Sequence, residues 1–397
     1  MSNPETTPER MLADTIDILR DLIAFPTVSS DSNLGLIVHL AARLTDAGAR
    51  VELMHDETGQ KANLFATLGP EGDGGIVLSG HTDVVPVAEQ EWSTDPFEMT
   101  ERDGRLYGRG SCDMKGFLAC CLAALPLWSG RDLARPLHFA FTYDEEVGCV
   151  GAMALAAQLA GRGLRPAMAL VGEPTGMAII DGHKGVDEYT VEFTGLEGHG
   201  SAPDRGVNAG EYAVRYVARL LELREELKTR APEGSPFDPP HSTLNLGRIS
   251  GGVAHNVIIG RAEVEWDLRP VQGADRDFVR DALDRLVRDD LLPAMRAVAP
   301  DADIVTHVIG QTVGLEPRAH NAARDLLAGS TGRNGTETAA FGTEAGIFQQ
   351  TGMDVAVCGP GDIAQAHKPD EYVEIAELAR CLDMLRGLTP YLIRSGG

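Results

Sequence analysis

The sequence predicts an α/β protein with a smaller domain inserted into the chain. Three observations lead to this prediction. Several short apolar runs end abruptly in ionisable residues, as buried strands do at the carboxyl edge of an α/β sheet. From about residue 183 the expected elements follow the order β-α-β-β-α-β of a ferredoxin-like unit. The chain has 397 residues, which is more than one hydrophobic core usually supports.

These observations divide the chain into three segments. We expect the first part of the larger domain over residues 1–182, the inserted domain over 183–309 and the second part of the larger domain over 310–397. A hydrophobic content of 43% and 45 glycines are typical of a globular α/β protein with many tight turns.

Charge and composition exclude several partners and locations. The formal net charge of −24 argues against nucleic acid and anionic membranes, because both bind basic surfaces. No run of about 18 apolar residues is present, so we expect no transmembrane helix. The N-terminal residues lack a basic segment followed by an apolar core, which favours the cytoplasm over secretion. The six cysteines form no C-x-x-C pair and are expected to be reduced and buried.

The first part of the chain is expected to alternate helices and strands. Apolar residues at helical spacing predict helices over 10–24 and 34–48, which end near Pro26 and at Gly48. Apolar runs predict strands over 50–55, 62–68, 76–78, 137–143 and 167–172. A further helix over 117–128 is expected directly after the glycine-rich loop 108–116.

The inserted domain and the final segment complete the pattern. Within the insertion we expect a strand over 187–195, a helix over 207–229, strands over 243–250 and 261–269, a helix over 276–298 and a strand over 303–309. A strand over 355–358 and an amphipathic helix over 374–394 are expected to close the chain.

His81 and Asp83 follow the strand expected over 76–78, in the sequence Ser79-Gly-His-Thr-Asp-Val-Val-Pro86. A histidine with a carboxylate two residues away can supply a metal ligand and the group that orients it. A strand-end histidine that only forms hydrogen bonds explains the pair equally well. Asp113, which stands before a helix, has the same ambiguity, because it can also be a simple helix N-cap.

Further carboxylates follow two other expected strands. Glu145 and Glu146 belong to three consecutive acids after the strand 137–143, and Glu173 follows the strand 167–172. Adjacent like charges at the mouth of a buried strand disfavour joint ionisation unless a cation neutralises them. A metal ion would do this, although a solvated acidic turn is the alternative.

The remaining candidates are polar or small residues in loops and at a strand end. Each of those in the inserted domain, taken alone, is at least as compatible with a residue that only forms hydrogen bonds. The remaining candidates are His199, Asn256 and Arg269 in the inserted domain, the small-residue loop with Gly342 and Thr343, and His367 in an elaborate loop near the end of the chain.

Together these motifs resemble a metallopeptidase family that includes aminoacylases, glutamate carboxypeptidases, succinyl-diaminopimelate desuccinylases and acetylornithine deacetylases. The segments SGHTDVVP, GRGSCDMKG, TYDEEVG, GEPT and AHKPDEY occur in the order of that family and span almost the whole chain. The resemblance implies a zinc-peptidase-like α/β catalytic domain with a mixed, largely parallel sheet between helices. It also implies that the inserted ferredoxin-like domain is a lid through which the family forms homodimers.

The resemblance also implies a centre with two divalent metal ions. His81 and Glu173 would bind one metal, Glu146 and His367 would bind the other, and Asp113 would bridge the two. A shared carboxylate is what two cations about 3.5–4 Å apart require. Nitrogen and oxygen ligands without thiolate suit Zn²⁺ first, and Co²⁺ or Mn²⁺ can also bind.

The resemblance assigns catalytic and substrate-binding roles to the other candidates. Asp83 would orient His81, Glu145 would be the general base, and His199 from a partner subunit would hold the oxyanion. Arg269 would clamp the α-carboxylate of the substrate. Additional hydrogen bonds to the substrate are expected from Asn256, Gly342 and Thr343.

The substrate that the resemblance implies is a small N-acyl amino acid. The loops 342–346 and 359–373 resemble those of the acetylornithine deacetylase branch, which cleaves N2-acetyl-L-ornithine in arginine biosynthesis, and Glu344 is an acidic residue that could meet the ammonium group of ornithine. The Ser-Gly-Gly-Thr-Ser-Asp segment of desuccinylases is not present. Two alternatives remain, namely a hydrolase of another N-acyl amino acid or of a C-terminal glutamate, and a non-catalytic metal-binding protein.

Overall fold

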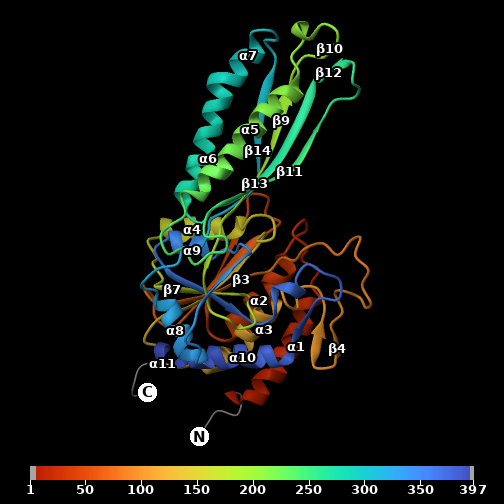
Figure 1. The fold of residues 1–397 in the computed structure, drawn as a ribbon. Helices are drawn as coiled ribbons and strands as arrows, with labels where there is room; N and C mark the ends of the chain where they lie inside the picture. The colour runs from red at the N-terminus through yellow and green to blue at the C-terminus, as the bar shows by residue number, and fades with distance from the viewer. Residues whose placement is uncertain (1–5, 394–397) are drawn as a thin grey trace. The chain divides into compact units, whose positions relative to one another are not determined.

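The computed structural model describes residues 6–393 and contains an eight-stranded sheet with the strand order β1-β2-β6-β3-β7-β16-β8-β15 (Figure 1). Neighbouring strands are parallel from β6 through β3 and β7 to β16, whereas the pairs β1–β2, β2–β6 and β8–β16 are antiparallel. This mixed, mostly parallel sheet confirms the predicted fold class. The strands are β1 (Arg50–His55), β2 (Ala62–Leu68), β3 (Ile76–His81), β6 (Leu137–Thr142), β7 (Met168–Pro174), β8 (Ile180–His183), β15 (Glu337–Ala339) and β16 (Asp354–Gly359).

Helices cover both faces of this sheet. α1, α2, α3, α8 and α10 pack in one group on one face, while α4 and α9 contact the other face (Figure 1). The helices are α1 (Pro8–Ile23), α2 (Leu34–Asp46), α3 (Lys115–Ala123), α4 (Val150–Gly161), α8 (Ala322–Thr331), α9 (Ala345–Gln350), α10 (Ile375–Gly387) and α11 (Thr389–Leu392). Among residues 6–393, none of the helices combines the length and apolar character that crossing a membrane would require.

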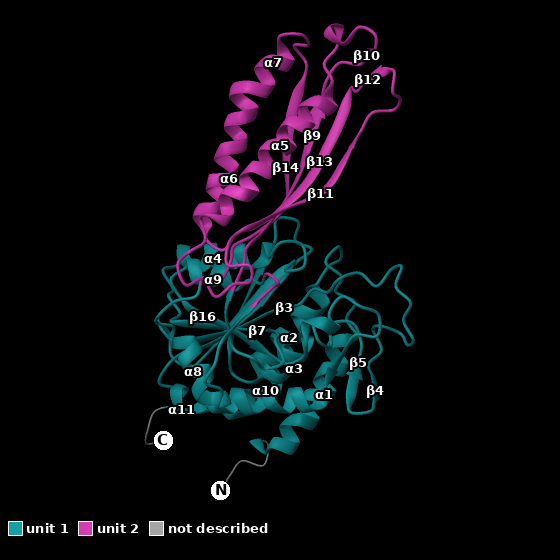
Figure 2. Cartoon of the chain, in the orientation of Figure 1, with its two compact units in different colours: residues 1–182, 317–338, 343–397 teal, residues 183–316, 339–342 magenta. Residues whose placement is uncertain are grey.

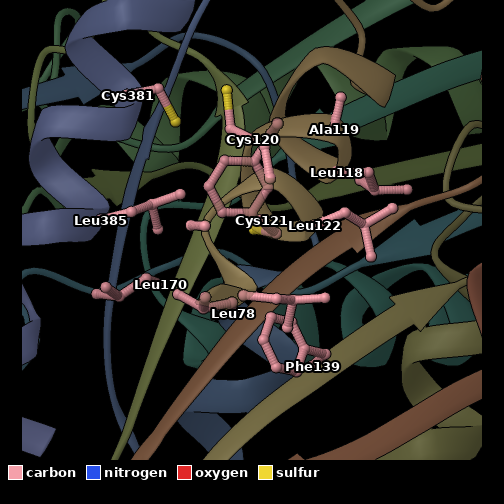
Figure 3. Close-up of a cluster of buried hydrophobic side chains, with 14 of the residues drawn as sticks. Leu78, Leu118, Ala119, Cys120, Cys121, Leu122, Phe139, Leu170, Cys381 and Leu385 are labelled. Atoms are coloured by element: carbon pink, nitrogen blue, oxygen red, sulfur yellow. The ribbon is translucent and has the colours of Figure 1, made fainter. Parts of the chain in front are cut away.

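The central strands are rigidly packed against these helices. Leu78 of β3, Phe139 of β6 and Leu170 of β7 are completely buried beside Leu118 of α3 and Leu385 of α10 (Figure 3). Strands buried on both faces need apolar side chains at every position, which is why they appear in the sequence as continuous apolar runs. Full burial of each such side chain contributes about 1.5–3 kcal/mol, so the strand ends are held in fixed positions.

The chain forms two compact units (Figure 2). Unit 1 comprises residues 1–182, 317–338 and 343–397, and unit 2 comprises residues 183–316 and 339–342. The domain boundaries expected from the sequence lay after residues 182 and 309. That unit 2 acts as a lid or in dimerisation stays a prediction.

Unit 2 is built on a four-stranded antiparallel sheet with the order β11-β13-β9-β14. Buried and exposed residues alternate along β9 and β13, because one face of the sheet packs against the helices. The elements are β9 (Val186–Thr194), β10 (Gly198–His199), α5 (Ala209–Lys228), β11 (Thr243–Gly251), β12 (Val257–Ile258), β13 (Arg261–Arg269), α6 (Gly273–Leu286), α7 (Leu292–Arg296) and β14 (Asp303–Thr312).

A second, three-stranded sheet in unit 1 joins distant parts of the chain. Its order is β17-β5-β4, and Val373 of β17 pairs with Leu106 of β5. The strands are β4 (Thr100–Arg102), β5 (Arg105–Tyr107) and β17 (Tyr372–Glu374). This sheet therefore fixes the segment before the glycine-rich loop against the segment that follows His367.

The structure differs from the sequence-based expectations in several elements. The helix expected over 276–298 is divided into α6, a π-helical turn (Val287–Leu291) and α7. The helix expected over 117–128 ends at Ala123, and a 3₁₀ turn that contains Pro126 follows it. The final helix is divided into α10 and α11, and its expected last residue, 394, lies outside the described residues. The elements that were not predicted are α4, α8, α9, β4, β5, β8, β10, β12, β15 and β17.

Candidate metal centre

The candidate metal ligands lie in unit 1, at or just beyond the carboxyl ends of the parallel strands. His81 ends β3, Glu146 follows β6 and Glu173 lies near the end of β7. His367 comes from the loop after β16, and Asp113 comes from the loop before α3. This edge of a parallel sheet is where α/β proteins usually bind ligands.

Asp113 lies between the two histidines. Its Oδ1 is 3.0 Å from His81 Nε2, and its Oδ2 is 3.3 Å from His367 Nε2. His367 Nε2 is also 3.0 Å from Glu146 Oε2, and His81 Nε2 is 3.8 Å from Glu173 Oε1. One carboxylate therefore faces two histidine nitrogens, each of which has a further carboxylate beside it.

Potential ligand atoms in this cluster are close enough for a metal ion. The ligand atoms of His81, Asp113 and Glu146 lie within 4.8 Å of one another, and so do those of His81, Glu145 and Glu173. The second group includes Glu145, so its position is compatible with a metal ligand as well as with the general base that the sequence predicts.

The donor set fits a divalent cation on two further grounds. Oε1 of Glu146 and Oε1 of Glu173 are buried, and neither has a hydrogen-bond partner among the described residues. Buried polar atoms normally have partners, because leaving them unpaired costs free energy. Histidine nitrogens and carboxylate oxygens are ligands that Zn²⁺ and similar ions accept.

The pKa values show an excess of negative charge at this site. Burial alone would lower the pKa of His81, but hydrogen bonds to Asp113 and Asp83 raise it well above its ordinary value. Hydrogen bonds to Asp113 and Glu146 raise the pKa of His367 to about 10. Burial raises the pKa of Glu145 to about 8, and burial together with the charge of Asp113 raises the pKa of Glu173 strongly. Without a metal ion, the buried carboxyl groups of Glu145 and Glu173 therefore bind protons more readily than exposed ones do, whereas the two histidines hold the pKa of Asp113 below its ordinary value.

The orientation of His81 is set mainly by the backbone. Its Nδ1 donates a hydrogen bond to the main-chain carbonyl of Asp83 at 2.9 Å, so Nε2 is left to face Asp113. The Asp83 carboxylate, which the sequence predicts as the orienting group, is 3.6 Å from Nδ1. It accepts hydrogen bonds from Ser29 Oγ at 2.7 Å and from the backbone N–H groups of Glu145 and Glu146 at 3.1 and 3.3 Å. Asp83 thus also holds the backbone of Glu145 and Glu146 in place.

Unit 2 contains four of the predicted residues. His199 and Asn256 are exposed. His199 ends β10 and Asn256 precedes β12, and these two strands pair with each other. The N–H of Gly200 also donates to the carbonyl of Asn256 at 2.8 Å. Arg269 ends β13 and pairs with Asp267 at 3.1 Å. Gly342, the fourth, belongs to unit 2 as well.

Two residues of the predicted small-residue loop, Thr343 and Glu344, are buried in unit 1. Thr343 Oγ1 accepts a hydrogen bond from the N–H of Ala345 at the start of α9. The Glu344 carboxylate accepts hydrogen bonds from Ser79 Oγ at 2.5 Å and from Thr142 Oγ1 at 2.8 Å. Both oxygens of Glu344 are therefore engaged inside the protein, which argues against the suggestion that it meets an ammonium group.

Sequence reasoning missed a buried ion pair next to the candidate ligands. Arg109 Nη1 and Glu371 Oε2 are 2.6 Å apart, and each side chain is 1% exposed. Both residues lie within motifs already quoted, but no local pattern indicates that they meet.

Sequence comparison relates the chain to known enzymes. Residues 77–389 match the model of peptidase family M20/M25/M40. An acetylornithine deacetylase from Photorhabdus laumondii is 38% identical over 368 residues, which cover 91% of this chain and 92% of that protein. An acetylornithine deacetylase from Proteus mirabilis is 39% identical over 371 residues, with the same coverage.

Structure comparison supports the same fold. The crystal structure of an M20 family metallo-carboxypeptidase from Sulfolobus solfataricus matches with a TM-score of 0.74 and covers 95% of this chain and 98% of that chain. The two sequences are only 17% identical, so this similarity concerns the fold alone.

Proposed function

The chain belongs to peptidase family M20/M25/M40, and on this premise we propose that it removes the acetyl group from N2-acetyl-L-ornithine to give ornithine and acetate. Membership makes it a hydrolase. The two acetylornithine deacetylases that are 38% and 39% identical over most of its length support this particular substrate.

The observation that carries the proposal is the position of Asp113 between His81 and His367. In the proposed centre His81, Asp113 and Glu173 hold one divalent cation, and Asp113, Glu146 and His367 hold a second. Zn²⁺ fits this donor set best, and Co²⁺ can replace it. Bound cations of this kind supply Lewis acidity for an amide carbonyl and lower the pKa of water.

Glu145 is the proposed general base. One of its carboxylate oxygens takes a proton from the water that attacks the amide carbonyl carbon, and then delivers that proton to the leaving amine nitrogen. Two contacts support this role. The Asp83 carboxylate holds the backbone N–H of Glu145, and the Cys149 thiol lies 3.4 Å from Oε1, so Oε2 is left for the proton.

The remaining proposed contacts with the substrate come from residues of unit 2 and from Thr343. Arg269 would bind the α-carboxylate through its guanidinium group, with hydrogen bonds from Gly342 and from Thr343 of unit 1. We further propose a homodimer in which His199 of one copy holds the oxyanion in the site of the other, and that Asn256 adds a hydrogen bond to the substrate. The exposure of both side chains supports these roles, because neither is committed to the core of its own unit.

An acetate-release assay tests the proposed reaction. The metal-free full-length protein is incubated with N2-acetyl-L-ornithine after addition of Zn²⁺ or Co²⁺, with and without a chelator. We expect acetate release that needs the metal and stops with the chelator.

A substrate panel tests the specificity. It contains succinyl-diaminopimelate, other N-acetyl amino acids and peptides with a C-terminal glutamate. Faster cleavage of one of these would reassign the substrate and leave the hydrolase intact. Absence of activity on every member with every metal would contradict the enzyme itself.

A further inference from the structure

Glu371 is a buried carboxylate that the proposed reaction does not use. Its Oε1 accepts hydrogen bonds from the backbone N–H groups of Cys112 at 2.9 Å and Asp113 at 3.0 Å. Its Oε2 accepts from the N–H of Gly110 at 3.1 Å and from Arg109 Nη1 at 2.6 Å. One side chain therefore holds the loop that carries the proposed bridging ligand.

Arg109 connects the same carboxylate to the loop of His367. Its Nη1 also donates to the main-chain carbonyl of Lys368 at 3.3 Å, and its Nη2 donates to Gln90 Oε1 at 2.6 Å. Gln90 in turn donates from Nε2 to the carbonyl of His367 at 3.1 Å. The consecutive main-chain carbonyls of His367 and Lys368 are thus tied to a group that also holds Asp113.

A buried ion pair of this kind needs a reason beyond stability. Removing two charges from water costs about as much as their attraction returns, so apolar residues of similar size would often serve a core equally well. The guanidinium and carboxylate groups instead offer several directional hydrogen bonds, which fix backbone positions. Here those bonds end on two loops that are more than 250 residues apart in the chain.

We propose that Arg109 and Glu371 are positioning residues that set the distance between the Asp113 carboxylate and the His367 imidazole. This inference rests on the proposed metal-binding roles of Asp113 and His367. Residues that orient metal ligands from behind typically change metal affinity by about 10- to 100-fold when they are replaced.

Titration of the metal-free full-length protein with Co²⁺ tests the inference without any substrate. Glu371→Gln keeps the size of the side chain but removes the charge and replaces one acceptor oxygen with a donor. We expect its Co²⁺ affinity, measured by calorimetry, to fall about 10- to 100-fold. We also expect the visible absorption spectrum of bound Co²⁺ to change, because the ligand geometry changes.

A matched control is available in unit 2. Asp275 is another completely buried carboxylate, and it pairs with Arg230 at 2.8 Å. Asp275→Asn therefore removes the same kind of group far from any proposed ligand in the sequence, and it should leave the Co²⁺ affinity and spectrum unchanged. Equal Co²⁺ affinity and equal spectra for Glu371→Gln, Asp275→Asn and the unaltered chain would overturn the inference.

Gln90→Ala provides a second test if Glu371→Gln does not fold. Gln90 is only half-buried, so its truncation leaves the core intact, while it removes the bond to the His367 carbonyl. We expect a several-fold loss of Co²⁺ affinity with an unchanged circular dichroism spectrum. Unchanged affinity would overturn the inference. Failure to release acetate while these Co²⁺ effects are present would contradict only the proposed substrate.

Discussion

A buried carboxylate of unit 2 differs from those of the candidate metal centre in unit 1. In unit 2, Asp275 is completely buried and both of its oxygens have donors, since Oδ1 accepts from Arg230 Nε at 2.8 Å and Oδ2 accepts from Ser242 Oγ at 2.6 Å. In unit 1, several carboxylates meet around two histidines. Oε1 of Glu146 and Oε1 of Glu173 there have no hydrogen-bond partner among residues 6–393.

This difference indicates where the protein needs a bound cation to neutralise its buried carboxylates. A buried carboxylate with an arginine and a hydroxyl partner needs nothing further. A cluster in which carboxylates outnumber histidines instead carries negative charge that its own protein atoms do not neutralise. We therefore expect unit 1, and not unit 2, to respond to metal ions.

The largest expected effect is that of Glu145→Gln. Loss of the general base should lower turnover about 10²- to 10⁴-fold, because that is the usual contribution of positioned proton transfer. Metal content, measured by elemental analysis, should stay that of the unaltered protein. Turnover at the normal rate would contradict the base assignment, whereas loss of metal would make Glu145 a ligand instead.

Metal addition should stabilise the protein through unit 1. At free Zn²⁺ concentrations of 100 to 1,000 times the dissociation constant, the expected gain is about 3–4 kcal/mol. Native-state hydrogen exchange shows which part of the chain is stabilised. Amides in segments 108–115 and 144–149 should exchange more slowly in the presence of Zn²⁺ than in the presence of chelator. If amide exchange in β9 and β13 of unit 2 slowed equally, the expectation that metal ions act on unit 1 and not on unit 2 would be contradicted.

Asp275→Asn should destabilise unit 2 by about 3 kcal/mol, at the low end of the cost of breaking a buried ion pair, because Arg230 is about one-third exposed. Urea unfolding measures this loss. The Co²⁺ affinity serves as the internal control and should not change. A variant with normal stability would show that unit 2 does not depend on its paired charge.

The fold could be predicted where the sequence pattern is local and strong. β3, β6 and β7 are buried on both faces and therefore appear as continuous apolar runs. α4 was missed because Val150–Gly161 consists mostly of alanine, glycine and other apolar residues, which leave no polar face at helical spacing. α9 has six residues, too few for that spacing to be recognised.

The candidate ligands could be predicted because each lies in a short motif after an expected strand or loop. Their supporting contacts could not. Arg109 and Glu371 are 262 residues apart, so only the folded chain brings them together. Likewise, the acceptor for His81 Nδ1 is a main-chain carbonyl, and a sequence carries no residue type that identifies such a group.

The smallest expected effect concerns buried histidines outside the metal centre, where the two units should behave alike. Burial lowers the pKa of His138 in unit 1 to about 4, and it lowers the pKa of His183 in unit 2 to about 4. Above pH 6.5 each imidazole is neutral in the folded and the unfolded chain. As the pH falls below 6.5, the unfolded chain binds a proton that the folded chain excludes until about pH 4, so stability falls with pH.

At pH 5 the loss is about 2 kcal/mol for each histidine, since one pKa unit corresponds to about 1.4 kcal/mol. His138→Phe keeps a ring against Phe65 and removes this titration, so urea unfolding should show a smaller fall in stability between pH 6.5 and 5. His183→Phe should flatten the dependence similarly. If only His138→Phe reduces the fall in stability, the two units also differ in the titration of buried histidines outside the ligand cluster. The excess of carboxylates in unit 1 would then not be the sole cause of the difference between the units.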